Sequence, residues 1–111
     1  MFRNVTYTSP GAKEAINLDP MLAPFNVAVQ VFVPAGTTVA YSVEFTLDDL
    51  SNSDGSPNTN VRWTTDPQFP TASADTITGN YIVPISAVRV NIASIAGGGV
   101  EFKVRQALSI N

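Results

Sequence analysis

Two stretches near the middle of the chain alternate strictly between apolar residues and small or polar ones. In both 25–33 and 39–47 the apolar side chains fall on the odd positions: Phe25, Val27, Val29, Val31, Val33, Val39, Tyr41, Val43, Phe45 and Leu47. Successive side chains of an extended strand point to opposite faces, so a period of two buries one face and leaves the other in water. The pattern predicts two half-buried β-strands.

The link between these strands, residues 34–38, leaves two arrangements open. In an antiparallel hairpin Val31 would face Tyr41 and Val29 would face Val43, which keeps the apolar side chains on one face. In a jelly roll the same link would instead cross from one sheet to the other. The alternation fits both arrangements.

The C-terminal third returns to the same pattern, now on even positions. The apolar residues are Ile82, Val88, Val90, Ile92, Val100, Phe102, Val104, Leu108 and Ile110. Three glycines, 97–99, separate the two halves and predict a turn. Pairing Arg89 with Glu101 would put opposite charges on the outer face. We therefore expect a second hairpin here.

Residues 1–24 are less regular. Pro10, Pro20 and Pro24 interrupt them and favour extended or turn geometry over helix. We expect short strands in this part. The predicted organisation is an N-terminal arm or edge segment, 1–24, followed by a β-sandwich domain, 25–111.

The remaining segments complete the fold prediction. Residues 48–60 are rich in Ser, Asn, Asp, Gly and Pro, which favour loops, and the prolines at 67 and 70 predict a second loop at 66–76. A helical period of 3.6 residues persists nowhere for more than a turn or two. Because the alternating faces need a second sheet to cover them, the predicted fold is all-β, an antiparallel jelly-roll-like β-sandwich.

Composition narrows the classes of function. The chain has 111 residues, 44% hydrophobic and only 14% charged, which indicates one folded domain whose surface partly contacts another protein. The net charge is −3 and the six basic residues are scattered, which argues against nucleic-acid and anionic-membrane partners. The first residues lack the apolar stretch of a signal peptide, and no segment approaches the roughly 20 apolar residues of a membrane span. We expect synthesis in the cytoplasm.

The sequence gives little indication of a catalytic or metal-binding site. The chain has no Cys and no His, which excludes thiolate or imidazole metal sites, Cys nucleophiles and His-based triads. Glu44, Asp48 and Asp49 are the carboxylates a hydrolase would need, but Glu44 lies on the polar face of a strand. We expect no catalytic residues, no cofactor and no small-molecule substrate.

The loop 48–60 leaves one metal hypothesis open. Asp48, Asp49 and Asp54 could form a loose calcium site, although Leu50 and Val61 stand where an EF-hand loop needs acids. The alternative is a solvated loop whose Asx side chains form turns.

Several apolar residues lie outside any clear alternation. Trp63 shares strand parity with Val61 and Thr65, which favours a core position over an exposed platform for a sugar or a partner. Five others have no alternating strand to bury them, so a protein interface and a satellite core both fit: Phe2, Tyr7, Met21, Leu22 and Phe69.

A family resemblance sharpens the functional prediction. It is carried by residues 41–49, Trp63, Pro67, residues 80–91, the glycine turn and Gln106-Ala107. Together these segments resemble small virion-associated proteins of tailed bacteriophages. Over residues 39–107 the chain is similar to the capsid decoration, or staple, proteins of epsilon15-like short-tailed phages.

The resemblance implies a jelly-roll-like homodimer at two-fold positions on the outer capsid surface of the virion. There it would tie neighbouring subunits of the major capsid protein together and stabilise the head, without enzymatic activity. The alternative is a receptor- or glycan-binding β-sandwich of a phage fibre or tail, in which Trp63 and the loop 48–60 would carry binding. Synthesis in the host cytoplasm suits assembly of a capsid staple before lysis.

Overall fold

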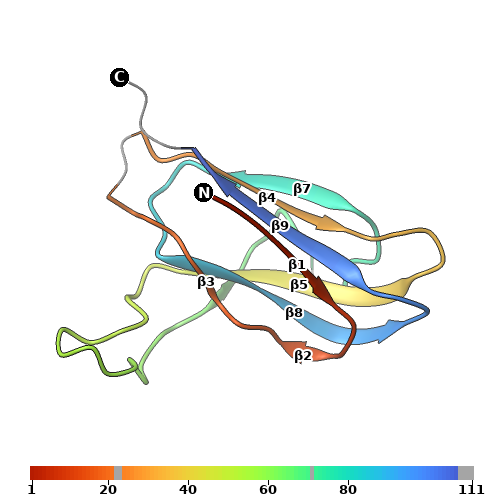
Figure 1. The fold of residues 1–111 in the computed structure, drawn as a ribbon, viewed down its shortest axis with the longest axis horizontal. Coiled ribbons are helices and arrows are strands. Elements are labelled where there is room, and N and C mark those ends of the chain that lie inside the picture. Colours follow the sequence, from red (N-terminus) through yellow and green to blue (C-terminus); the bar gives the residue numbers. More distant parts are fainter. Residues whose placement is uncertain (22–23, 71, 108–111) are drawn as a thin grey trace.

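The computed structural model describes residues 1–21, 24–70 and 72–107. They form two antiparallel β-sheets packed face to face, so the predicted all-β sandwich is confirmed (Figure 1). These residues include no helix long and apolar enough to cross a membrane.

Each sheet has a simple strand order. Sheet A contains, in order, β1 (Phe2–Tyr7), β9 (Val100–Gln106), β4 (Val27–Phe32) and β7 (Ile77–Tyr81). In sheet B, β8 (Ala87–Ala96) pairs on one side with β2 (Gly11–Ala12) and β3 (Ile16–Asn17). On its other side β8 pairs with β5 (Thr38–Thr46), and β5 pairs in turn with β6 (Thr64–Thr65).

Of the two arrangements left open for the link 34–38, the structure has the crossing between sheets, and the hairpin expected at 97–99 is wrong, because the link β8–β9 also crosses. Strand β5 pairs with β8, and β9 lies between β1 and β4. Arg89 therefore faces Glu44 rather than Glu101. The apolar faces of β4 and β5 therefore meet across the core, and the two strands do not lie side by side in one sheet. The alternation is the same in both arrangements.

The two crossing links pack on each other at one end of the sandwich. Gly97 has a φ of +83°, and a Cβ added there would lie 2.4 Å from the carbonyl oxygen of Gly36. Only glycine combines this left-handed conformation with so close an approach of two backbones.

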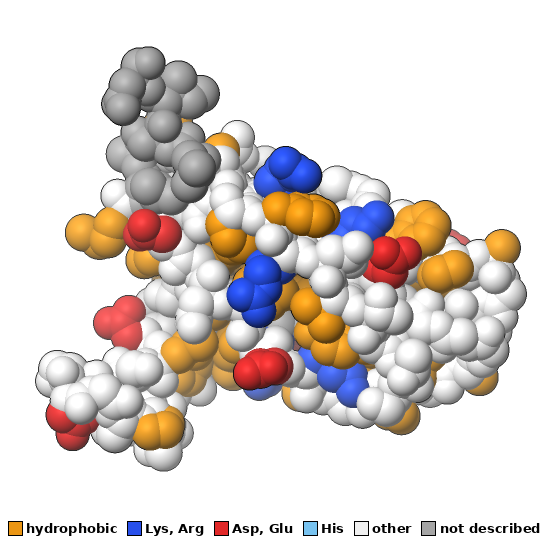
Figure 2. Space-filling model, viewed as in Figure 1, with side chains coloured by type: hydrophobic (Ala, Val, Ile, Leu, Met, Phe, Trp, Pro, Cys, Tyr) orange, Lys and Arg blue, Asp and Glu red, His pale blue; other side chains and the backbone are white. Residues whose placement is uncertain are grey.

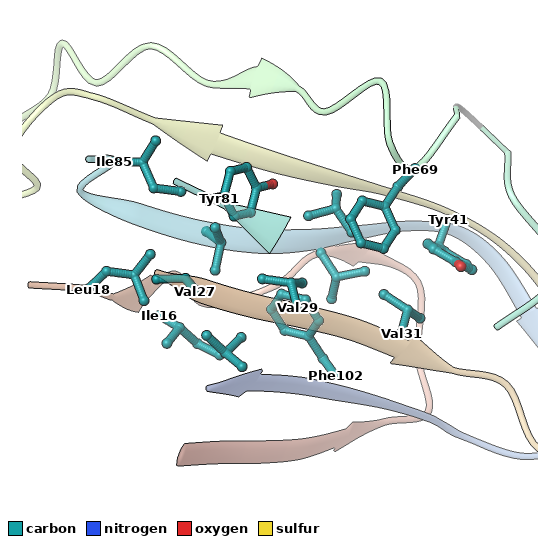
Figure 3. Close-up of a cluster of buried hydrophobic side chains, with 14 of the residues drawn as sticks. Ile16, Leu18, Val27, Val29, Val31, Tyr41, Phe69, Tyr81, Ile85 and Phe102 are labelled. Carbon is teal, nitrogen blue, oxygen red and sulfur yellow. The ribbon is translucent and has the colours of Figure 1, made fainter. Parts of the chain in front are cut away.

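The predicted buried faces of the four long strands are confirmed. Val27, Val29 and Val31 of β4 are fully buried, as are the alternating apolar residues in the middles of β5, β8 and β9. Figure 3 shows the β4 valines pointing into the space between the sheets. Each such side chain contributes about 1.5–3 kcal/mol of burial free energy.

The N-terminal residues belong to the sandwich rather than to a separate arm. Strand β1 forms one edge of sheet A, and β2 and β3 form an edge of sheet B. Ile16 and Leu18 are buried in the common core. Residues 1–21 thus lie at the edges of both sheets and contribute to the core.

Candidate interaction surfaces

Two acidic side chains of loop 48–60, those of Asp48 and Asp54, accept hydrogen bonds from the loop or from the residues just after it. Asp48 accepts a hydrogen bond from the Arg62 backbone N–H at 2.8 Å. Asp54 accepts two from Ser56, one from its hydroxyl and one from its backbone N–H, and these hydrogen bonds lower the pKa of the Asp54 carboxyl. Within residues 1–21, 24–70 and 72–107, no three Asp, Glu, His or Cys side chains converge as metal ligands would. The contacts are those of a loop braced by Asx turns.

Trp63 lies on the outer face of sheet B, which corrects its expected place in the core. The guanidinium of Arg89 lies 4.2 Å from the centre of the Trp63 ring and forms an ion pair with Glu44 at 2.7 Å. Strand β6 begins only at Thr64, so the strand parity used to place Trp63 does not extend to it. Arg89 covers one face of the indole, which leaves less of it for stacking on a sugar.

The five predicted interface residues separate into different environments. Phe2 is half exposed and Met21 is 87% exposed, whereas Tyr7 is half-buried against the core. Leu22 lies outside the described residues. Phe69 is fully buried, so its assignment to an interface is corrected.

A turn explains the burial of Phe69. Its N–H donates to the carbonyl of Asp66 at 3.0 Å, which directs the ring between the sheets. A Cβ added to Gly79 would lie 2.8 Å from the Phe69 ring, so the glycine makes room for it. Phe69 is a core residue held by a loop, which no alternation could reveal.

Exposed apolar side chains gather at one end of the sandwich. Leu47, Ile82 and Val83 are 63%, 71% and 62% exposed and form what we call the apolar rim. They surround a hollow of about 350 Å³ whose inner walls include Phe45, Tyr81 and Ile85. Single exposed apolar residues are ordinary, but a group around a hollow is typical of an interaction site.

Strand parity had placed Leu47 and Ile82 in the core, and both placements are wrong. Strand β5 ends at Thr46, one residue too early to bury Leu47. In β7 the buried residues are Gly79 and Tyr81, on odd positions, so Ile82 follows the strand on the outward-facing parity. The signal was present, because Asp48 and Pro84 follow closely and end the strands. Alternation predicts which side chains are buried only within a strand, up to its last residue.

The polar groups beside the hollow are already satisfied. The buried carboxylate of Asp66 accepts hydrogen bonds from the Tyr81 hydroxyl, the Gln68 backbone N–H at 2.9 Å and the Gln68 side-chain amide. Burial raises the pKa of the Tyr81 hydroxyl, and its hydrogen bond to Asp66 raises it further. Tyr81 is therefore a neutral donor at physiological pH. The hollow offers apolar walls to a partner rather than an unpaired charge.

A second surface is the outer face of sheet A. Arg105 lies over the Phe2 ring at 4.6 Å, and Lys103 lies over the Phe32 ring at 5.1 Å. Figure 2 shows apolar and basic side chains interleaved over β1 and β9. Such cation–π pairs hold the long basic side chains close to the sheet.

Comparison with protein-family models and with curated proteins found no match for this chain. The described residues supply an apolar rim around a hollow and a mixed aromatic and basic sheet face, both suited to contact with another protein.

Proposed function

We propose that the protein is a non-enzymatic capsid decoration protein of a bacteriophage, which binds the outer shell and ties neighbouring subunits of the major capsid protein together. The observation that carries the proposal is the apolar rim, because it concentrates exposed aliphatic surface at one end of a rigid body. Burying such surface stabilises a complex by about 25 cal/mol per Å². The resemblance of residues 39–107 to staple proteins names the partner.

We further infer that the sandwich is a jelly roll. If β2 and β3 count as one interrupted strand, each sheet has four strands and every link except β5–β6 crosses between the sheets. Eight strands wound in this way as two Greek keys are typical of viral capsid and lectin domains. This support is by analogy, since one fold serves many functions.

The apolar rim is small, so one rim would bind one capsid subunit weakly, and several rims bound at once would bind the shell strongly. The three side chains of the rim project from two neighbouring chain segments, 46–48 and 82–84, which the sandwich holds in place. A capsid repeats the same site many times, and a dimer that contacts two subunits at once gains affinity without new contacts. A homodimer on the outer surface of the virion is therefore part of the proposal.

The rim is tested by replacing Ile82 with Asp and measuring cosedimentation of the pure protein with phage heads stripped of decoration. An aspartate at an interface would be desolvated without a partner, so we expect at least a tenfold loss of affinity, which corresponds to about 1.4 kcal/mol. Ile82 is largely exposed, so the variant should keep the unfolding temperature of the parent protein.

The matched control is Ala35→Asp, at an exposed apolar residue of the link between β4 and β5 that does not line the hollow. It should bind heads as the parent does. Parent-like binding by the Ile82 variant would remove the rim from the proposal, and no binding of the parent protein would remove the function.

A further inference from the structure

The free edge of β1 presents unpaired backbone groups at alternate residues. Met1 N–H donates to the Gln106 carbonyl at 2.9 Å, and Gln106 N–H donates to the Met1 carbonyl at 2.8 Å. Hydrogen-bonded pairs alternate along an antiparallel ladder, so odd residues of β1 bond to β9. The N–H and C=O groups of Phe2, Asn4 and Thr6 therefore point away from the sheet.

The other sheet edges are blocked or short. At the opposite edge of sheet A, Asn80 N–H donates to the side-chain carbonyl of Gln68 at 3.0 Å, and the Gln68 amide donates back to the Asn80 carbonyl at 2.9 Å. In sheet B the edge strands β2, β3 and β6 have two residues each. Proteins commonly protect strand edges in such ways. In the described part of the chain, β1 is the long edge strand whose outward backbone groups have no hydrogen-bond partner.

We propose that β1 pairs antiparallel with β1 of a second copy of this chain, about a two-fold axis through Asn4. In this register Asn4 faces Asn4 of the second copy, and Phe2 faces Thr6. The outward backbone groups of all three residues then pair, and the two four-stranded sheets become one continuous sheet.

Charge complementarity is the reason for choosing a second copy as the occupant. On the outer face Arg105 leans from β9 over Phe2, and Glu101 leans over β1 to accept a hydrogen bond from the Asn4 side chain at 3.1 Å. Thr6 is the β1 neighbour of Glu101. Because Phe2 faces Thr6 of the other copy, Arg105 of each copy meets Glu101 of the other.

The opposite face of β1 carries a second set of charged side chains. Arg3, Tyr7 and Glu14 line a hollow of about 260 Å³ between β1 and the segment that carries β3. In the proposed register Arg3 lies diagonally across from Tyr7 of the second copy, beside Glu14 there. The same register also sets the two Arg3 side chains diagonally across the axis from each other, so the charge pairing that favours a second copy is the one on the outer face.

The pairing rests on the proposed function and gives it a geometry. Across sheet A, Met1 pairs with Gln106, Gln106 with Val27, and Val27 with Tyr81. Tyr81 directly precedes the rim residue Ile82, so β1 begins at the same end of the sandwich as the apolar rim. Antiparallel pairing of β1 sends the two rims to opposite ends of the dimer. Two separated contacts are what tying neighbouring subunits requires.

The first test is Asn4→Pro, followed by sedimentation velocity of the pure protein over a range of concentrations. Proline removes an outward N–H at the two-fold axis and leaves the β1–β9 bonds in place, so we expect a dimeric parent and a variant that dissociates at least tenfold more readily. Thr78→Pro is the matched control, since Thr78 is an outward residue on the opposite edge. It should remain dimeric, and circular dichroism with thermal unfolding checks that both variants fold.

The second test uses charge reversal, which leaves the backbone unchanged. Arg105→Glu and Glu101→Arg should each weaken the dimer, because each places like charges opposite one another, and the double variant should restore it. Lys103→Glu is the control, since Lys103 leans toward Phe32 of β4, away from the edge. It should have no effect on the dimer.

A parent protein that is monomeric at every concentration, or a dimer unchanged by both Asn4→Pro and the single reversals, would overturn the pairing. A dimer that behaves as expected but does not bind stripped heads leaves the pairing intact and refutes the proposed function. A monomer that loses head binding on Asn4→Pro would mean that a strand of the shell, not a second copy, occupies the edge.

Discussion

At the scale of single residues, the Asp66–Tyr81 contact joins the loop 66–70 to strand β7. Both side chains are buried, and Asp66 also fixes the turn that places Phe69 in the core. A buried carboxylate is stable only while its hydrogen-bond donors remain. The contact thus stabilises a loop that the alternating strands do not hold.

Tyr81→Phe tests this contact. It removes a donor from a buried carboxylate, so we expect a loss of about 1–3 kcal/mol in the free energy of unfolding, measured by urea titration at pH 7. The control is Tyr41→Phe, which removes a hydrogen bond to the uncharged carbonyl of Asp75. That change should cost about 0.5–1.5 kcal/mol, and an equal or greater loss would contradict a special role for Asp66.

The same tyrosines determine the response to alkaline pH. Burial raises the pKa of Tyr81, and burial with the nearby Asp75 charge raises the pKa of Tyr41 to about 12. A raised pKa means that the folded state holds its proton more tightly, so this stability is complete below pH 10 and falls as pH rises above it. Urea titrations from pH 9 upward should show this fall, and Tyr81→Phe should reduce its slope. A pH-independent stability would contradict the burial of both hydroxyls.

At the scale of elements, the sequence predicted which face each long strand buries but not which strand lies beside it. Alternation has the same period whether the next strand pairs laterally or packs across the core, so it cannot separate these cases. Arg89 illustrates the ambiguity, since both Glu44 and Glu101 stand at plausible positions and only the sheet pairing selects Glu44.

Gly97→Ala tests the packing of the two crossing links. The methyl group of an alanine there would clash with the Gly36 carbonyl, and the alanine backbone would have to adopt a positive φ. Gly36→Ala is the matched control, because its φ is +89° but the space around its Cβ position is open. Both should lose about 1 kcal/mol or more for the backbone conformation, and Gly97→Ala about 1–3 kcal/mol more for the clash. Equal losses by thermal unfolding would contradict the close packing of the links.

At the scale of the whole molecule, the sequence predicted the class of fold and part of the candidate surfaces. Phe2 and Met21 are exposed, but their role at an interface stays a prediction, and the exposed rim residues Leu47 and Ile82 stand where the alternation favours the core. Where a strand ends depends on its neighbours in the sheet, and a one-residue difference moves a side chain from core to surface. Phe69 shows the converse, since a turn buried a residue that no periodic pattern could place.

The two surfaces on which the proposals rest lie at separate places on the sandwich. The rim lies at one end of the sandwich, while the free edge of β1 runs along its side. A decoration protein needs both, because it must hold the shell and span two subunits.

The most direct measurement is saturation binding of the purified protein to phage heads stripped of decoration. We expect saturable binding at a fixed ratio to the major capsid protein, with two copies at each two-fold position of the shell. Binding that never saturates, or that is absent at concentrations where the protein is folded and dimeric, would contradict the assignment.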